Sequence, residues 1–150
     1  MSDNFIRFIS TDPHHVPDID AREHMVRVVR QAFPKADSVE ELVHDEVSFV
    51  DAGANFEAAF CPACDAELDG DWWASEMEAA FDAEAVVLDI ILPCCGDASS
   101  LNDLRYEWAQ GFARYVIEVT NPGAGDVPES LMSALSQHLG GAVRAIWAHY

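Results

Sequence analysis

The chain has 150 residues, half of them hydrophobic, and a formal net charge of −19. This length is typical of one domain with a single core, and the hydrophobic content excludes an intrinsically disordered chain. No apolar run approaches the ~20 residues of a membrane-spanning helix, and the N-terminus lacks the basic flank and apolar stretch of a secretory signal. We therefore expect a cytoplasmic protein without a membrane partner.

The charge is distributed unevenly along the chain. All eight basic residues lie outside residues 36–104, whereas 18 of the 27 acidic residues lie inside that stretch. Because phosphate groups are bound mainly by lysine and arginine, the acidic middle excludes nucleic acid and anionic lipid and favours a basic protein partner. The alternative is that the acidity serves solubility or adaptation to a salty cytoplasm.

The first third of the chain predicts a strand followed by a helix. Residues 5–9 are β-branched or aromatic except for one arginine, which is typical of a strand. Asp20 and Glu23 have the spacing of a capping box, and apolar residues then recur at helical spacing until Pro34. We expect a helix over residues 20–33.

The acidic middle predicts three strands and a second helix. Residues 42–50 and 55–60 have strand composition, and the glycine-containing turn between them indicates a hairpin. Asp71 suits an N-cap, and the apolar spacing that follows predicts a helix over residues 71–82. Residues 85–92 form the most strand-like segment and are apolar enough for a central strand.

The last third predicts a helical turn, two strands and a third helix. Residues 100–104 form a capped turn, and residues 112–120 a strand. A helix opens at Pro128 and stops at Gly140, and residues 142–150 form the final strand.

Together these elements predict one α+β domain over residues 1–150, with a mixed sheet of about six strands and three main helices. The sequence shows no internal repeat and no low-complexity linker.

All four cysteines lie in two short motifs, Cys61–Cys64 and Pro93–Gly96, each directly after a predicted strand. If these strands are parallel neighbours joined by a right-handed crossover through the intervening helix, their ends lie together. Four thiolates collected in this way form a tetrahedral zinc site. We expect a structural Zn²⁺ that joins the two strand ends through Cys61, Cys64, Cys94 and Cys95.

The second motif departs from the usual Cys-x-x-Cys because its two cysteines are adjacent. Adjacent side chains of a strand point to opposite faces, so both sulfurs bind one ion only if the chain turns sharply between Pro93 and Gly96. Otherwise one of the two thiols is packed in the protein. The fourth ligand then comes from His44, Asp97 or His149.

The cysteines also permit a thiol oxidoreductase. A redox Cys-x-x-Cys motif sits at the first turn of a helix, which lowers the thiol pKa. Here the acidic residues 65, 67 and 69 would raise that pKa, and Gly70 delays the helix. A saturated four-thiolate site leaves no open coordination position, and no phosphate loop, nucleophile elbow or metalloprotease motif is present, so we predict no catalytic residues.

Three segments carry a resemblance to a known group of proteins: Phe60–Cys64, Leu92–Gly96 and residues 100–113, followed by the closing residues 148–150. They resemble an uncharacterised family of small bacterial proteins from high-GC genomes, over about the last two thirds of the chain. The cysteine segments also resemble zinc-ribbon knuckles, with Asp65 at the position where such knuckles usually have glycine. The resemblance implies no activity.

These observations predict a zinc-stabilised acidic protein that binds a basic partner, for example an immunity protein that neutralises a toxin. One alternative is a zinc-ribbon-like accessory module of a larger assembly, and another is a Cys-x-x-Cys thiol oxidoreductase. Residues expected to contact the partner come from the second helix, the loop before it and the segment after residue 100: Asp69, Asp71, Trp72, Glu76, Asn102, Asp103 and Arg105.

Overall fold

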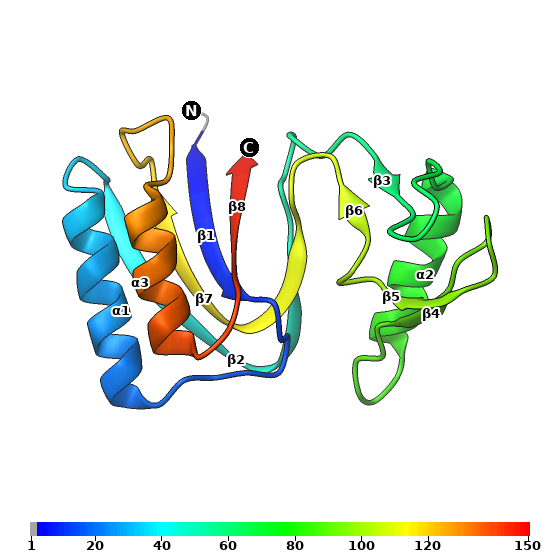
Figure 1. The fold of residues 1–150 in the computed structure, drawn as a ribbon, viewed down its shortest axis with the longest axis horizontal. Helices are drawn as coiled ribbons and strands as arrows, with labels where there is room; N and C mark the ends of the chain where they lie inside the picture. The colour runs from blue at the N-terminus through cyan, green and yellow to red at the C-terminus, as the bar shows by residue number, and fades with distance from the viewer. Residues whose placement is uncertain (1–2) are drawn as a thin grey trace.

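A four-stranded antiparallel sheet with two helices on one face forms the larger part of the structure (Figure 1), a computed structural model that describes residues 3–150. The strand order across the sheet is β2-β7-β1-β8, and α1 packs against α3. We call this part, residues 3–55 and 108–150, the sheet lobe. Its elements are β1 Asn4–Ser10, α1 Ile19–Ala32, β2 Ser38–Val50, β7 Gly111–Thr120, α3 Glu129–Leu139 and β8 Val143–His149.

The core of the sheet lobe lies between the sheet and the two helices. Met25 and Val29 of α1 and Leu135 of α3 meet Ile6 and Ile117 of the sheet, and none of these side chains is more than 2% exposed. Helical spacing places the apolar residues of each helix on one face, and burial of that face stabilises the pairing of helix and sheet.

Aspartates cap two of the helices, in each case two positions before the residue expected from the sequence. The Asp18 carboxylate accepts a hydrogen bond from the first turn of α1, so Asp18 and not Asp20 is the N-cap. Asp69 caps α2 (Gly70–Asp82) in the same way, by accepting from the Asp71 N–H. Both aspartates of each run suit a cap by residue type, and the path of the incoming chain decides which one is used.

Residues 56–107 form a second lobe that contains all four cysteines, and we call it the cysteine lobe (Figure 1). It combines α2 with two small antiparallel sheets, β3 (Ala59–Phe60) with β6 (Arg105–Tyr106) and β4 (Asp89–Ile91) with β5 (Ala98–Ser100). Val47 and Phe112 of the sheet lobe complete its apolar core, so the two lobes belong to one α+β domain. Members of that core from the cysteine lobe are Ala59, Cys61, Leu68, Ala80, Ile90, Leu92, Leu101, Leu104 and Tyr106.

The α+β class and the three helices are confirmed, but the strands are distributed over three sheets. The predicted hairpin of residues 42–50 with 55–60 is wrong, because β2 pairs with β7 and the short β3 pairs with β6. A long apolar strand such as β7 offers β2 a continuous partner, which the short segment after residue 55 does not. No helix among the described residues is long and apolar enough to cross a bilayer.

The expected central strand over residues 85–92 is reduced to the three residues of β4. Within the described residues 3–150 it pairs only with β5, in an antiparallel hairpin, so the predicted parallel neighbours and crossover are wrong. Val87 and Ile91 are exposed although apolar, whereas Ile90 and Leu92 are buried in the core and Val86 and Leu88 pack against it half-buried. An apolar run does not distinguish a strand buried on both faces from one buried on a single face.

A buried polar cluster joins the two lobes. The Asn102 side chain donates to the Thr11 carbonyl (2.9 Å) and accepts from the Phe112 N–H (3.2 Å). Arg144 donates to the Asn102 Oδ1 (3.1 Å) and to the Gln110 carbonyl (2.8 Å). Because Asn102 and Gln110 are at most 3% exposed, these bonds are shielded from water and hold the cysteine lobe on the sheet.

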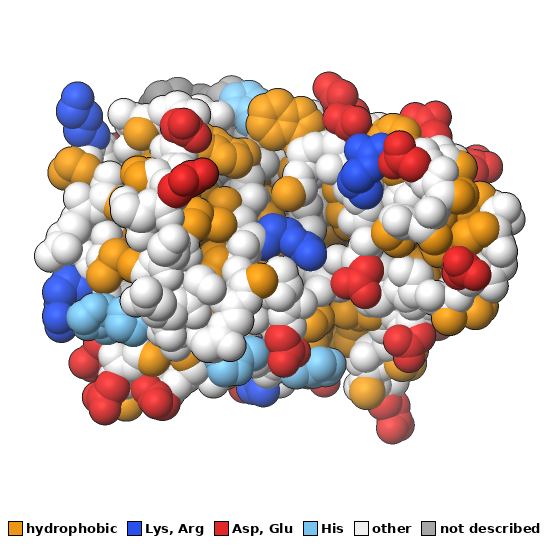
Figure 2. Space-filling view, in the orientation of Figure 1, with side chains coloured by type: hydrophobic (Ala, Val, Ile, Leu, Met, Phe, Trp, Pro, Cys, Tyr) orange, Lys and Arg blue, Asp and Glu red, His pale blue; other side chains and the backbone are white. Residues whose placement is uncertain are grey.

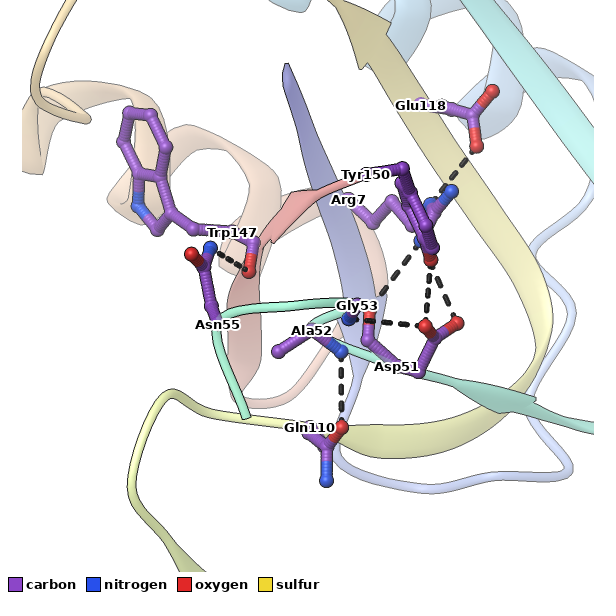
Figure 3. Close-up of polar contacts among 9 residues, drawn as sticks. All are labelled: Arg7, Asp51, Ala52, Gly53, Asn55, Gln110, Glu118, Trp147 and Tyr150. Carbon is purple, nitrogen blue, oxygen red and sulfur yellow. Dashed lines mark hydrogen bonds and ion pairs between the residues drawn. The ribbon is translucent and has the colours of Figure 1, made fainter. Parts of the chain in front are cut away.

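A second set of contacts holds the end of β2 against β8 (Figure 3). The Tyr150 hydroxyl donates to the Asp51 carboxylate (2.6 Å) and accepts from Arg7 (2.9 Å). Gly53 follows with a φ of +61°, and a Cβ there would lie 2.4 Å from the His149 carbonyl oxygen. Only glycine allows the chain to pass this close to β8.

Candidate metal centre

The four cysteine sulfurs gather at one point of the cysteine lobe, within 4.8 Å of one another. The Cys64 and Cys94 sulfurs are 3.4 Å apart, and those of Cys61 and Cys95 are 3.8 Å apart. A tetrahedral zinc ion with Zn–S bonds of about 2.3 Å requires sulfurs about 3.8 Å apart, so the donor set and its spacing suit such an ion. His44, Asp97 and His149, the alternative fourth ligands, are not members of this cluster.

The first knuckle, residues 61–66, is a tight turn that aims backbone N–H groups at sulfur. The Cys61 sulfur accepts from the N–H groups of Ala63 and Cys64, both at 3.4 Å. The Asp65 N–H donates to the Cys61 carbonyl (2.9 Å), and Asp65 adopts a left-handed φ of 62°. Donors directed at sulfur stabilise a thiolate, which is the form that binds metal.

The second knuckle, residues 92–97, repeats this turn. The Leu92 N–H donates to the Asp97 carbonyl (2.9 Å), and the Gly96 N–H to the Leu92 carbonyl (2.8 Å). Gly96 has a left-handed φ of 76°, like the residue at the same place in the first knuckle. The sharp turn directs the sulfurs of both Cys94 and Cys95 toward the first knuckle. Both adjacent cysteines can therefore bind the same ion.

Burial and hydrogen bonding divide the thiols into unlike groups. Cys61 is 1% exposed, whereas the other three cysteines are exposed. Burial raises the pKa of Cys61, but the N–H groups of Cys64 and Ala63 outweigh it and lower the pKa to about 7. For Cys94, desolvation and the neighbouring Cys64 thiol raise the pKa to about 12. A divalent ion that binds here would therefore displace its protons mainly from the thiols of the second knuckle, because the Cys61 thiol loses its proton at a lower pH.

Charge around the sulfurs is almost entirely negative. The cysteine lobe contains 13 acidic residues and one basic residue, Arg105. The Arg105 guanidinium contacts the Asp65 carboxylate at 2.6 Å and lies 4.2 Å from the centre of the Phe60 ring. Because four thiolates and one divalent cation sum to a charge of about −2, metal binding would leave the lobe still anionic.

Asn102 is the one predicted partner-contact residue that the structure places inside the protein. It is 3% exposed, and its side chain is used in the junction between the lobes. The role of Asn102 in the segment after residue 100 is therefore structural, because its side chain holds the two lobes together.

The other predicted contact residues lie around α2 and β6. Trp72 and Glu76 are half-buried on α2. The remaining four are exposed, and they are Asp69, Asp71, Asp103 and Arg105.

The geometry disfavours a redox role for the first motif. Helix α2 begins at Gly70, six residues after Cys64, so neither thiol lies in the first turn of this helix. Cys61 is also buried, whereas an exchanging thiolate must reach its disulfide substrate.

Sequence reasoning missed the equivalence of the two knuckles. Its signal is a shared proline, Pro62 and Pro93, 31 residues apart, each followed two residues later by Cys64 or Cys95. Comparisons with protein-family models, with curated protein sequences and with solved structures find no match to this chain.

Proposed function

We propose that this chain is a zinc-stabilised acidic protein whose cysteine lobe binds a basic protein partner. The observation that carries the proposal is the cluster of four sulfurs within a lobe of 13 acidic residues and one basic residue. Zinc replaces a larger hydrophobic core in small lobes, because metal binding contributes directly to folding free energy. The resulting rigid anionic surface attracts a cationic protein and speeds its association.

In a four-thiolate centre the metal ion has a structural role and not a catalytic one. Zinc bound by four protein ligands has no open position for water or substrate. The reduced thiols that it requires suit the cytoplasm, where we place the protein. An immunity protein that neutralises a basic toxin is the specific case that we favour, since acidic inhibitors of this kind act by charge complementarity with a rigid surface.

Elemental analysis with a thiol count tests the metal half of the proposal. We expect about one zinc per chain and no reactive thiols until a chelator is added. A metal-free protein with four reactive thiols, purified without chelators, would contradict it.

A pair of charge variants tests the partner half. One variant neutralises four of the 13 acidic residues of the cysteine lobe with Asp69→Asn, Asp71→Asn, Glu76→Gln and Asp103→Asn. The matched control neutralises four exposed acids of the sheet lobe with Glu23→Gln, Glu40→Gln, Asp45→Asn and Asp126→Asn. We expect the first variant to lose salt-sensitive binding to a basic toxin encoded beside the gene, and the control to retain it. Equal binding by both variants, or binding insensitive to salt, would refute the charge mechanism.

A zinc-ribbon-like accessory module is the second candidate, and the repeated knuckle turn favours it. Such a module would copurify with a defined assembly at high salt. A basic partner lost at high salt distinguishes the first function from this one.

A further inference from the structure

The cysteine lobe contains two equivalent hairpins related by a shift of 31 residues. In the first, Cys61 bonds to Ala66 and Leu68 bonds to Ala59 through their backbones. In the second, Leu92 bonds to Asp97 in the same way, and Ile90 pairs with Ser99. Residues 59–68 and 90–99 therefore share one hydrogen-bonding pattern, and one hairpin can serve as a template for the other.

The outer edge of the first hairpin is covered by another strand. β6 pairs with β3 in antiparallel register, with Phe60 opposite Arg105, and the Glu107 N–H donates to the Ala58 carbonyl (2.8 Å). The Arg105 side chain lies over the Phe60 ring and reaches the Asp65 carboxylate. The covering strand thus brings one cation, which contacts an aromatic and an acidic side chain of the hairpin.

The equivalent edge of the second hairpin is open at Asp89 and Ile91, whereas the Val87 N–H before them donates to the Ala80 carbonyl of α2 (3.2 Å). The backbone groups of Leu88 and Leu92 form hydrogen bonds across the hairpin, to Leu101 and Asp97. In an antiparallel strand the backbone N–H and C=O groups of successive residues point alternately to one side and to the other. The backbone N–H and C=O groups of Asp89 and Ile91 therefore point away from β5. Among residues 3–150, no hydrogen bond satisfies these four groups.

The side chains along this edge suit an apolar and cationic ligand. Ile91, at the position equivalent to Phe60, is 63% exposed, and Val87 on the same strand segment is 50% exposed. Asp89 and Glu76 line a shallow groove beside Ile91. Figure 2 shows hydrophobic side chains and carboxylates intermingled over the cysteine lobe.

Resting on the proposed binding of a basic partner, we propose that the open edge of β4 accepts an extended basic segment of that partner as an additional antiparallel strand. The segment supplies the missing backbone bonds to Asp89 and Ile91, as β6 does for β3. An alternating apolar and basic pattern places its apolar residues against Ile91 and its cations near Asp89 and Glu76. A second copy of this chain is a poor occupant, since antiparallel self-pairing sets acidic edges against each other.

A synthetic peptide of about nine residues, alternating arginine and valine, is the probe for this edge. We expect its binding to zinc-loaded protein to shift the amide signals of Asp89 and Ile91 in NMR spectra and to slow their hydrogen exchange at least tenfold. The same peptide N-methylated at alternate residues keeps its charge but cannot complete the ladder. It should bind at least tenfold more weakly.

Two proline variants on opposite edges of the hairpin supply the matched control. Ile91→Pro removes the outward N–H of β4, and Ala98→Pro removes that of β5, at the position directly opposite. We expect a tenfold or greater loss of peptide affinity for Ile91→Pro and no loss for Ala98→Pro, with zinc content unchanged in both. Ile91→Lys, which leaves the backbone intact, should also weaken binding.

The outcomes separate this inference from the proposed function. Salt-sensitive binding that is unaffected by N-methylation and by both Ile91 variants would refute strand addition at the β4 edge. It would still agree with the proposed binding of a basic partner. No binding of any basic peptide or protein would overturn both. Self-association that Ile91→Pro abolishes, measured by sedimentation, would assign the edge to a second copy and refute the basic segment.

Discussion

Leu92 occupies in the second knuckle the position that Cys61 occupies in the first, and both side chains are 1% exposed. The ligand missing at that position is supplied from two residues further on by Cys94, which stands where the first knuckle has Ala63. The centre therefore has one pair of sulfurs at equivalent knuckle positions, those of Cys64 and Cys95, whereas Cys61 corresponds to Leu92 and Cys94 to Ala63.

Moving the fourth ligand to the position of Leu92 should preserve the metal centre. We expect Cys94→Ala to weaken metal affinity by about 100-fold or more, because one of four ligands is lost. Adding Leu92→Cys to that variant should restore most of the affinity. The Co²⁺ spectrum of tetrahedral thiolate ligation, measured in competition with a chelator, reports both changes.

The control for this rescue is the pair Leu92→Ser with Cys94→Ala, which has a similar side chain without a thiol. It should remain as weak as Cys94→Ala alone. Failure of Leu92→Cys to rescue would show that the two knuckles are not equivalent.

Removing the buried ligand should unfold the cysteine lobe. Cys61→Ser eliminates one ligand and the N–H···S bonds of the knuckle, and it should cost several kcal/mol when metal is present. Hydrogen exchange in residues 56–107 should accelerate more than in the sheet lobe, whose core of residues such as Met25 and Leu135 does not touch the sulfurs. Ala63→Ser, at the exposed tip of the same turn, is the matched control and should have little effect.

Metal affinity should rise with pH. The raised pKa values of Cys94 and Cys95 keep both thiols protonated at neutral pH in the metal-free protein, and only thiolates bind zinc. Binding therefore releases at least two protons, and affinity should increase at least ~100-fold per pH unit between pH 7 and pH 8 and fall correspondingly as the solution is acidified. Calorimetry in two buffers with different ionisation heats counts the protons, and pH-independent affinity would contradict the assignment.

Gly53 should be intolerant of any side chain. Gly53→Ala forces alanine into a left-handed conformation at a cost of about 1–2 kcal/mol and places its Cβ against the His149 carbonyl, so a total loss above ~2 kcal/mol is expected. Gly125→Ala is the control, because no atom lies within 4 Å of its added Cβ. Denaturant unfolding of the two variants measures the difference, and equal midpoints would refute the close approach.

Asn102 should matter for stability and not for partner binding. Asn102→Ala leaves the buried Phe112 N–H and the Thr11 carbonyl without their side-chain partner and removes one of the acceptors of Arg144, which keeps the Gln110 carbonyl, at a cost of about 3 kcal/mol. The neighbouring exposed Asp103→Ala should change stability by at most ~0.5 kcal/mol. Chemical denaturation gives both values, and a surface role for Asn102 would reverse their order.

Local patterns were sufficient for the helices and for the location of the candidate centre. Apolar residues recurring at helical spacing predicted α1, α2 and α3 to within a few residues, because that periodicity depends only on the helix itself. The α1 and α2 caps were displaced because neighbouring aspartates are chemically equivalent.

The pairing of strands that are distant in the chain could not be predicted from local sequence patterns. The sequence shows that residues 38–50 and 59–60 favour strands, but the partner of each depends on which surface is left to cover after the chain has folded. The antiparallel hairpin of β4 and β5 replaced the expected parallel crossover for this reason.

The sequence alone determined that four thiols would meet in an acidic setting, since cysteine spacing and charge are properties of the chain itself. Only the tertiary structure decided that they meet as two copies of one turn, with Leu92 buried in place of a ligand and one hairpin edge covered while the other stays open. The direction of a hydrogen bond and the burial of a side chain depend on contacts between residues far apart in the chain. A local sequence pattern does not show which distant residues will make these contacts.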